Sequence, residues 1–166
     1  MIVVKSMGKS LGWHGIRLGY AVANTQLAQE LRNKLPYWNI NGLAGFVLKN
    51  MSRFRDEYKE SFVKIAADRD YMYQQLQKVQ GLQTYPSQCN FLFSELPSGV
   101  SGIEVRDLLL EKYGLVVREC SNKEGSTDSF LRNVVRRPVD TDKLVHALKA
   151  VLAAYTETET LEKALA

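Results

Sequence analysis

Residues 6–24 read SMGKSLGWHGIRLGYAVAN, a segment punctuated by glycines that contains a single lysine, Lys9. A β-branched run, residues 2–5, precedes this segment, and a second apolar run, residues 16–23, overlaps its end. Glycine-rich stretches between two such runs are typical of loops that connect strands. The pattern therefore predicts a strand, a loop that carries Lys9, and a second strand.

Three side chains of this segment suit the binding of an anionic electrophile. Lys9 is an amine on a glycine-flanked loop, where a desolvated amine can act as a nucleophile or form a Schiff base. Ser6 offers a hydroxyl and Arg17 a rigid guanidinium, and both can bind one phosphate if the loop folds back. The spacing alone is equally consistent with ordinary solvated charges, because most lysines lie at protein surfaces.

The rest of the first half of the chain predicts helices. Asn24 or Thr25 can cap a short helix over residues 26–35, in which leucines recur every four residues. A further helix is expected from about Leu43. Apolar residues at helical spacing then predict a long amphipathic helix over residues 54–81.

The second half of the chain predicts a mixture of strands and helices. Ser101 and Glu104 have the spacing of a capping box at the start of a helix that Gly114 ends, and Asp140 is expected to cap the last helix. Strands are predicted at residues 88–94, 115–118 and 130–135. This order suggests an α+β layer with helices on one face of a sheet.

The chain is expected to have three parts. Residues 1–50 do not fit inside the α+β layer, because two short strands cannot form an independent sheet. They are therefore predicted to be the edge of a larger domain. Residues 51–155 are predicted to form a small domain, and residues 156–166 a polar tail.

The composition is that of a globular protein without a nucleic-acid or membrane signature. The chain has 166 residues, of which 45% are hydrophobic, so it can bury a core. Its 22 basic and 18 acidic residues are interspersed, and the two cysteines show no disulfide or metal-binding spacing. The sequence lacks an apolar run of about 20 residues and a signal peptide, so a cytoplasmic protein is expected.

The Ser6-x-x-Lys9 pattern, followed by Arg17 in an Ile-Arg-Leu-Gly-Tyr setting, resembles the cofactor-lysine segment of class I/II aminotransferases. These are pyridoxal-phosphate enzymes of fold type I. The resemblance implies an α/β fold in which Lys9 forms a Schiff base with the cofactor and transfers the substrate α-proton. It also implies that Ser6 and Arg17 hold the cofactor phosphate.

The resemblance continues in residues 114–122 (GLVVRECSN) and 130–138 (FLRNVVRRP), which are similar to the small domain of the same enzymes. Arg132 falls where these enzymes bind the substrate α-carboxylate. Arg118 resembles the arginine that meets the substrate phosphate in histidinol-phosphate aminotransferases and threonine-phosphate decarboxylases. For each arginine, an ordinary exposed charge is the alternative.

Other residues near the lysine carry weaker expectations. A lone histidine on a loop is usually structural or solvent-facing, and His14 is expected to be so. Trp13 and Trp38 could stack on a ligand or pack at an interface, and packing at an interface is expected. Asn39 and Asn41 lie in a loop that resembles one near the active site of the family.

The resemblance also implies that part of the cofactor site is missing. In the family, the aspartate at the pyridine nitrogen and the aromatic residue on the ring precede the lysine by long stretches, whereas eight residues precede Lys9 here. We therefore expect the C-terminal portion of an aminotransferase that acts on an amino acid, phosphorylated or not, and a weak catalyst in isolation. Its partners are expected to be an amino-acid substrate and either a second copy or the missing N-terminal portion. A decarboxylase of amino-acid phosphates on the same scaffold and a non-catalytic truncated fragment are the alternatives.

Overall fold

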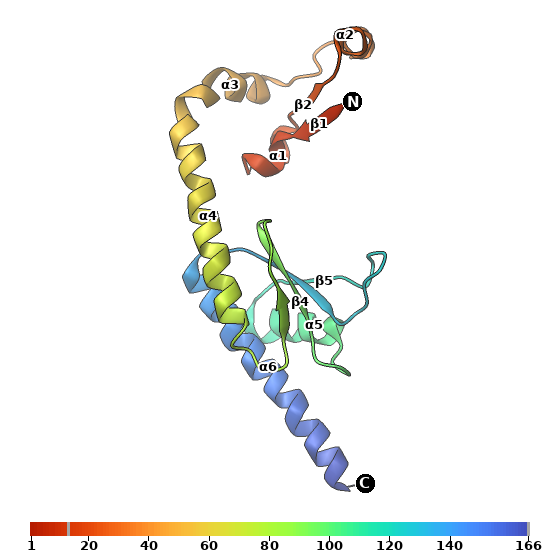
Figure 1. The fold of residues 1–166 in the computed structure, drawn as a ribbon, viewed down its shortest axis with the longest axis vertical. Helices are drawn as coiled ribbons and strands as arrows, with labels where there is room; N and C mark the ends of the chain where they lie inside the picture. The colour runs from red at the N-terminus through yellow and green to blue at the C-terminus, as the bar shows by residue number, and fades with distance from the viewer. Residues whose placement is uncertain (13, 166) are drawn as a thin grey trace. The chain divides into compact units, whose positions relative to one another are not determined.

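The computed structural model describes residues 1–12 and 14–165, with side chains described for residues 1–9, 11–12 and 14–155. The chain divides into two compact units, Met1–Tyr58 and Lys59–Ala166 (Figure 1). Helix α4 begins before this boundary in the sequence and continues beyond it.

The first unit contains two strands and several short helices. Its elements are β1 (Val3–Ser6), α1 (Met7–Ser10), the 3-10 helix η1 (His14–Ile16), β2 (Gly19–Val22), α2 (Thr25–Lys34), α3 (Gly42–Asn50) and the 3-10 helix η2 (Met51–Phe54). Strands β1 and β2 pair antiparallel in a two-stranded sheet. The predicted strand, loop and strand are confirmed, with the difference that the connection contains the helical turn α1 and the 3-10 helix η1.

Asparagine side chains begin the two longer helices of this unit. Asn24 caps α2, because its Oδ1 accepts a hydrogen bond from the Leu27 amide at 2.9 Å. Asn41 caps α3 in the same way, through the Ala44 amide at 2.9 Å. An N-cap side chain satisfies one of the amides that the first helical turn leaves free, so these asparagines fix where each helix starts.

The first unit buries little apolar surface. Among its described residues, the buried hydrophobic side chains are Leu18, Ala44 and Val47. Large apolar residues of this unit exposed by 67% or more are Met1, Val4, Tyr37, Trp38, Leu43 and Phe46. The described part of this unit therefore leaves more large apolar side chains in water than it buries in a core.

The second unit is a four-stranded antiparallel sheet with helices. Its elements are the greater part of α4 (Arg55–Leu76), then β3 (Gln83–Tyr85), β4 (Phe91–Glu95), α5 (Gly102–Tyr113), β5 (Arg118–Glu119), β6 (Phe130–Val134) and α6 (Pro138–Leu165). The strand order is β3-β4-β6-β5, so β6 lies between β4 and β5.

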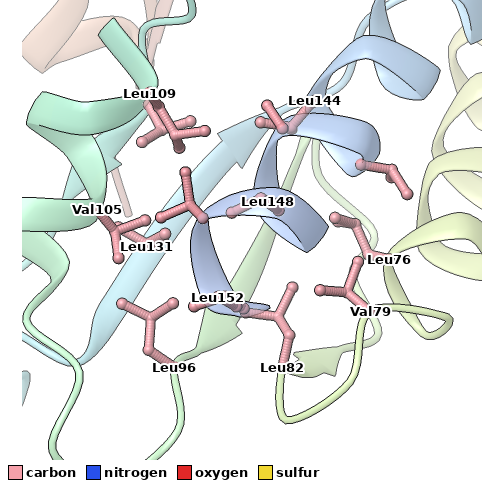
Figure 2. Packing of buried hydrophobic residues seen from close by; sticks show 14 of the residues in the cluster. Leu76, Val79, Leu82, Leu96, Val105, Leu109, Leu131, Leu144, Leu148 and Leu152 are labelled. Atoms are coloured by element: carbon pink, nitrogen blue, oxygen red, sulfur yellow. The ribbon is translucent and has the colours of Figure 1, made fainter. Parts of the chain in front are cut away.

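Alternation along β4 and β6 divides the sheet into two faces. Leu92 and Ser94 of β4, and Leu131 and Asn133 of β6, are at most 1% exposed, whereas the residues between them are partly exposed. The buried face packs against apolar side chains of the helices (Figure 2), namely Met72 and Leu76 of α4, Val105 and Leu109 of α5, and Leu144, Leu148 and Leu152 of α6. The predicted α+β layer with helices on one face is thereby confirmed.

The start of α5 differs from the predicted capping box. The helix begins at Gly102 and ends before Gly114, which has the left-handed φ of 64°, as predicted. However, the Ser101 side chain makes no capping hydrogen bond. Glu104 instead accepts a hydrogen bond from the hydroxyl of Tyr155 at 2.8 Å, so a contact between α5 and α6 takes the place of the local cap.

Other element boundaries also differ from the prediction. Helix α6 begins at Pro138 and not after Asp140, since the amides of Asp140 and Thr141 both donate to the Arg137 carbonyl. Proline suits the first turn of a helix because that turn needs no amide from it. Helix α6 also continues to Leu165, through the expected polar tail, and β3 is a strand that the sequence did not predict.

The Tyr155 hydroxyl is expected to ionise late. Burial and the hydrogen bond to Glu104 raise the pKa of Tyr155 from 10.0 to about 12. Because the fold favours the neutral phenol, this contribution to stability is complete below about pH 10 and is lost as the pH rises towards 12. The difference in phenolate absorbance between the wild type and Y155F should therefore titrate near pH 12. A difference that titrates near the ordinary tyrosine value of about 10 would contradict the contact.

Candidate functional site

Ser6, Lys9 and Arg17 come together at one end of the β1–β2 hairpin. Ser6 is the last residue of β1 and pairs with Gly19, the first residue of β2. The Met7 amide donates to the Leu18 carbonyl at 2.9 Å, which holds the residues that follow β1 beside those that precede β2. Lys9 lies on the helical turn α1 directly after β1 and is exposed. Pairing of the strands thus brings a hydroxyl, an amine and a guanidinium to one region of the first unit.

Arg17 has an unusual backbone conformation. Its φ is 57°, in the left-handed region, which costs a non-glycine residue about 1–2 kcal/mol. The neighbours on both sides are fixed, because Asn41 Nδ2 donates to the Ile16 carbonyl at 2.9 Å and the Leu18 carbonyl accepts from Met7. Strained residues persist where the surroundings hold them, and they gather at functional sites.

Gly19 is required by the close approach of the two strands. A Cβ at this position would lie 2.9 Å from the Lys5 carbonyl oxygen, nearer than side chains normally come to backbone. A side chain two residues after Arg17 would therefore collide with the backbone of β1, which explains the glycine at this position.

Arg118 and Arg132 are direct cross-strand partners in the second unit. They are paired in the antiparallel register of β5 with β6, so their side chains leave the same face of the sheet. This is the face opposite the core, because Leu131 and Asn133 on either side of Arg132 are buried. Two like charges at paired positions repel one another, and a bound anion would relieve that repulsion.

Arg132 is partly buried and has an unsatisfied nitrogen. Its Nε is buried without a hydrogen-bond partner. Its Cζ lies 5.1 Å from the centroid of the Phe91 ring, within the range of a cation–π contact. An aromatic ring against a guanidinium holds the cation in place without neutralising it, so the charge of Arg132 stays available to an anionic ligand.

No carboxylate in the described part of the chain neutralises the arginine pair. Neither Arg118 nor Arg132 forms an ion pair there. Glu95 extends from the same sheet face, but its carboxylate accepts the Tyr85 hydroxyl at 2.5 Å, which raises the pKa of that tyrosine. The two guanidinium groups therefore remain available to a ligand.

The other residues that the sequence singled out are placed as follows. His14 lies in η1 and is exposed, as expected. Trp38 is 97% exposed, so its packing at an interface stays a prediction. Asn41 joins α3 to the loop of Arg17 as described above, whereas Asn39 is an exposed loop residue. The expectation for Trp13 lies outside the described residues.

Neither a metal cluster nor a membrane helix occurs in the part of the chain that the structure describes. There, no group of three or more His, Cys, Asp or Glu side chains could hold a metal ion. None of its helices is long and apolar enough to cross a bilayer. Cys89 is exposed and Cys120 buried, and both are free thiols.

An amine, a hydroxyl and a guanidinium at one end of a strand pair, together with a separate arginine pair, are groups that suit small anionic ligands. Residues 1–151 match the family model described as aminotransferase class I and II. The chain belongs to this family, whose enzymes use pyridoxal phosphate. Its mixed α/β structure corresponds to part of the fold of these enzymes.

The relatives include decarboxylases and aminotransferases. The L-serine phosphate decarboxylase of Sulfurospirillum multivorans is 31% identical over 154 residues, which are 92% of this chain and 39% of that protein. The solved structure of a decarboxylase from the same organism has a TM-score of 0.83 at 31% identity and covers 91% of this chain and 43% of its own. The structure of histidinol-phosphate aminotransferase from Clostridium acetobutylicum also has a TM-score of 0.83, at 29% identity, over 92% of this chain and 46% of that one.

The chain spans less than half the length of these relatives. It covers 26% of the CMP-5'-(3-aminopropyl)phosphonate synthase of Streptomyces rubellomurinus and 39% of the serine phosphate decarboxylase. It corresponds to their C-terminal part.

The sequence did not predict the contact of Phe91 with Arg132 or the hydrogen bond from Asn41 to the Ile16 carbonyl. Phe91 sits in a predicted strand of alternating residues, and only the register with β6 brings it to Arg132. Asn41 lies in a loop that resembles one near the active site of the family. Its hydrogen bond to the Ile16 carbonyl, however, joins positions 25 residues apart. Neither contact has a local signal in the sequence.

We expect Asn41→Ala to loosen the loop of Arg17, because it removes both the α3 cap and the bond to the Ile16 carbonyl. Asn24→Ala is a matched control, since it removes a helix cap of the same geometry in α2. Each loss should cost about 1 kcal/mol. Only Asn41→Ala should speed backbone amide exchange in residues 14–19, which hydrogen-exchange mass spectrometry can measure. Equal exchange of that segment in the two variants would contradict a specific role for Asn41.

Proposed function

We propose that this chain is the C-terminal portion of a pyridoxal-phosphate-dependent aminotransferase that acts on a phosphorylated amino acid. Lys9 is the amine that holds the cofactor, and Ser6 and Arg17 bind its phosphate. Arg132 binds the substrate carboxylate, and Arg118 the substrate phosphate. Family membership supports the reaction class, and the arrangement of the named residues supports their roles.

The observation that carries the proposal is the cross-strand pairing of Arg118 with Arg132. Two guanidinium groups on one sheet face, without a carboxylate partner among the described residues, suit a ligand with two anionic groups. A carboxylate and a phosphate on one small molecule meet that requirement. A relative named for L-serine phosphate, which carries both groups, favours the same class of substrate.

The residues at the end of the β1–β2 hairpin fit the cofactor. Lys9 is exposed on the turn after β1, and Ser6 and Arg17 flank that turn through the Met7–Leu18 hydrogen bond. Lys9 and Arg17 form no ion pair with the described residues. When bound, pyridoxal phosphate supplies an electron sink for the pair of electrons released at the substrate Cα.

The side chains of this chain position the substrate and move its proton. A planar guanidinium binds a carboxylate through two parallel hydrogen bonds, so Arg132 restricts rotation of the substrate about Cα. The Lys9 amine can accept the Cα proton and return it to another atom, which is general acid–base catalysis by one group.

Decarboxylation of an amino-acid phosphate is the second candidate function. The serine phosphate decarboxylase and the decarboxylase structure named above support it, at 31% identity in each case. Loss of the carboxylate and loss of the Cα proton start from the same bound substrate. The products distinguish them, because decarboxylation releases carbon dioxide and an amine, whereas transamination gives a keto acid.

We further propose that residues 1–58 are completed by more polypeptide. Both strands of the first unit are exposed along their length, and a two-stranded sheet is not stable alone. The apolar residues exposed there require a cover, which a second copy or the remainder of the large domain would provide.

We expect pyridoxal phosphate to react with Lys9 in preference to Lys5. Both lysines are exposed, but Lys5 lies within β1, on the far side of Ser6 from the turn that carries Lys9. Incubation with the cofactor, reduction with borohydride and peptide mass mapping should find the added mass mainly at Lys9. Ser6→Ala and Arg17→Ala should each reduce this labelling, because they remove phosphate contacts.

Lys9→Ala and Lys5→Ala are the matched controls for this labelling. The first should abolish the selective label and the second should leave it intact. Equal labelling of the two positions would contradict the role of Lys9. Single-turnover incubation of the unreduced, cofactor-loaded chain with O-phospho-L-serine then identifies the reaction. A loaded chain that forms neither product would favour a non-catalytic fragment.

A further inference from the structure

We propose that Phe91 is a positioning residue that orients Arg132 for end-on binding of the substrate carboxylate. The inference rests on the proposed function of Arg132 and adds to it the residue that fixes its geometry. Phe91 pairs with Val134 in the β4–β6 register, and Phe93 pairs with Arg132. Phe91 and Arg132 are therefore diagonal neighbours on the open face of the sheet.

The ring of Phe91 lies against the guanidinium of Arg132. The distance from Cζ to the ring centroid is 5.1 Å, inside the limit of about 6 Å for a cation–π contact. The negative face of the ring attracts the cation and partly offsets the repulsion from Arg118. The position of Phe91 is itself fixed, since the Val135 amide donates to the Asn90 carbonyl at 2.9 Å just beyond the strand pairing.

Burial of Nε determines which edge of the guanidinium a ligand can use. The Arg132 Nε is buried without a hydrogen-bond partner, whereas neither Nη atom is both buried and unpartnered. A carboxylate that binds this guanidinium would therefore have to use the two Nη atoms and not the edge formed by Nε and one Nη. Stacking on a rigid ring also removes rotamers of the long arginine side chain before the ligand arrives, so less entropy is lost on binding.

This arrangement predicts that Phe91 affects only ligands that carry a carboxylate. O-phospho-L-serine has a carboxylate and a phosphate, whereas phosphoethanolamine has the same amine and phosphate without the carboxylate. In calorimetric titrations of the full chain, Phe91→Leu should weaken binding of O-phospho-L-serine roughly 3- to 30-fold. Binding of phosphoethanolamine should stay within about twofold of the wild type, because its affinity does not depend on the carboxylate contact.

Three further variants separate positioning from general damage to the sheet. Phe91→Trp keeps an aromatic face and should restore most of the affinity for O-phospho-L-serine. Phe130→Leu is the matched control, because Phe130 lies on the same face but stacks on Phe93, at 4.9 Å between centroids. Pentafluorophenylalanine at position 91 keeps the ring shape and reverses its quadrupole, so it should weaken binding even if Phe91→Leu does not fold.

The outcomes distinguish this inference from the proposed function. Unchanged binding of O-phospho-L-serine by Phe91→Leu and by the fluorinated variant would overturn the role of Phe91 and leave the arginine site intact. Equal weakening of both ligands would also overturn it, because that is the effect of a structural change. A wild-type chain that binds O-phospho-L-serine no better than phosphoethanolamine would contradict the proposed function itself.

Discussion

Pairing of β6 with both of its neighbours is the constraint on which the second unit depends. In this register Leu131 faces the helices and Arg132 faces away from them. A shift of one residue would exchange the two faces, placing a guanidinium in the core and a leucine outside. Buried polar contacts resist such a shift, because Ser94 Oγ lies 3.0 Å from Thr84 Oγ1 and accepts Asn133 Nδ2 at 3.2 Å. The same register that completes the core thus sets Arg118 beside Arg132.

In the first unit, too, strand pairing determines where the candidate site residues lie. Antiparallel pairing of β1 with β2 brings Ser6 next to the residue that follows Arg17 and Leu18, and the turn between the strands presents Lys9. Arg17 is held in a left-handed conformation by bonds to the residues on either side. In both units, then, groups that suit an anion are placed by backbone pairing and not by side-chain salt bridges. Such groups keep their charge free for a ligand.

Local patterns in the sequence predicted most of the elements but not the contacts between them. The helices over α2, α5 and α6 follow from apolar spacing and from cap residues such as Asn24 and Gly114. Strand β3 was missed because three residues with one buried side chain, Thr84, are too few to show alternation. The capping box at α5 was wrong because Tyr155, 51 residues from Glu104, competes for that carboxylate.

For the candidate site too, the sequence predicted the residues but not the contacts between them. Ser6, Lys9, Arg17, Arg118 and Arg132 were predicted from their resemblance to a family, and membership of that family is confirmed. Their roles stay predictions. The pairing of Arg118 with Arg132 and the contact of Phe91 with Arg132 depend on the register of three strands, which no local spacing in the sequence reveals.

The central claim, that the arginine pair is an anion site, is tested most directly by observing its guanidinium groups. In the chain labelled with nitrogen-15 at arginine, the Nε–Hε signals of Arg118 and Arg132 can be followed by NMR during titration with O-phospho-L-serine. Variants with lysine at each position assign the signals, and Arg136 and Arg137, which lie 3.7 and 3.5 Å from Asp140, serve as internal references. We predict that Arg118 and Arg132 shift together with one dissociation constant while the references do not move. Shifts of equal size at all four arginines, or none at the pair, would contradict the account.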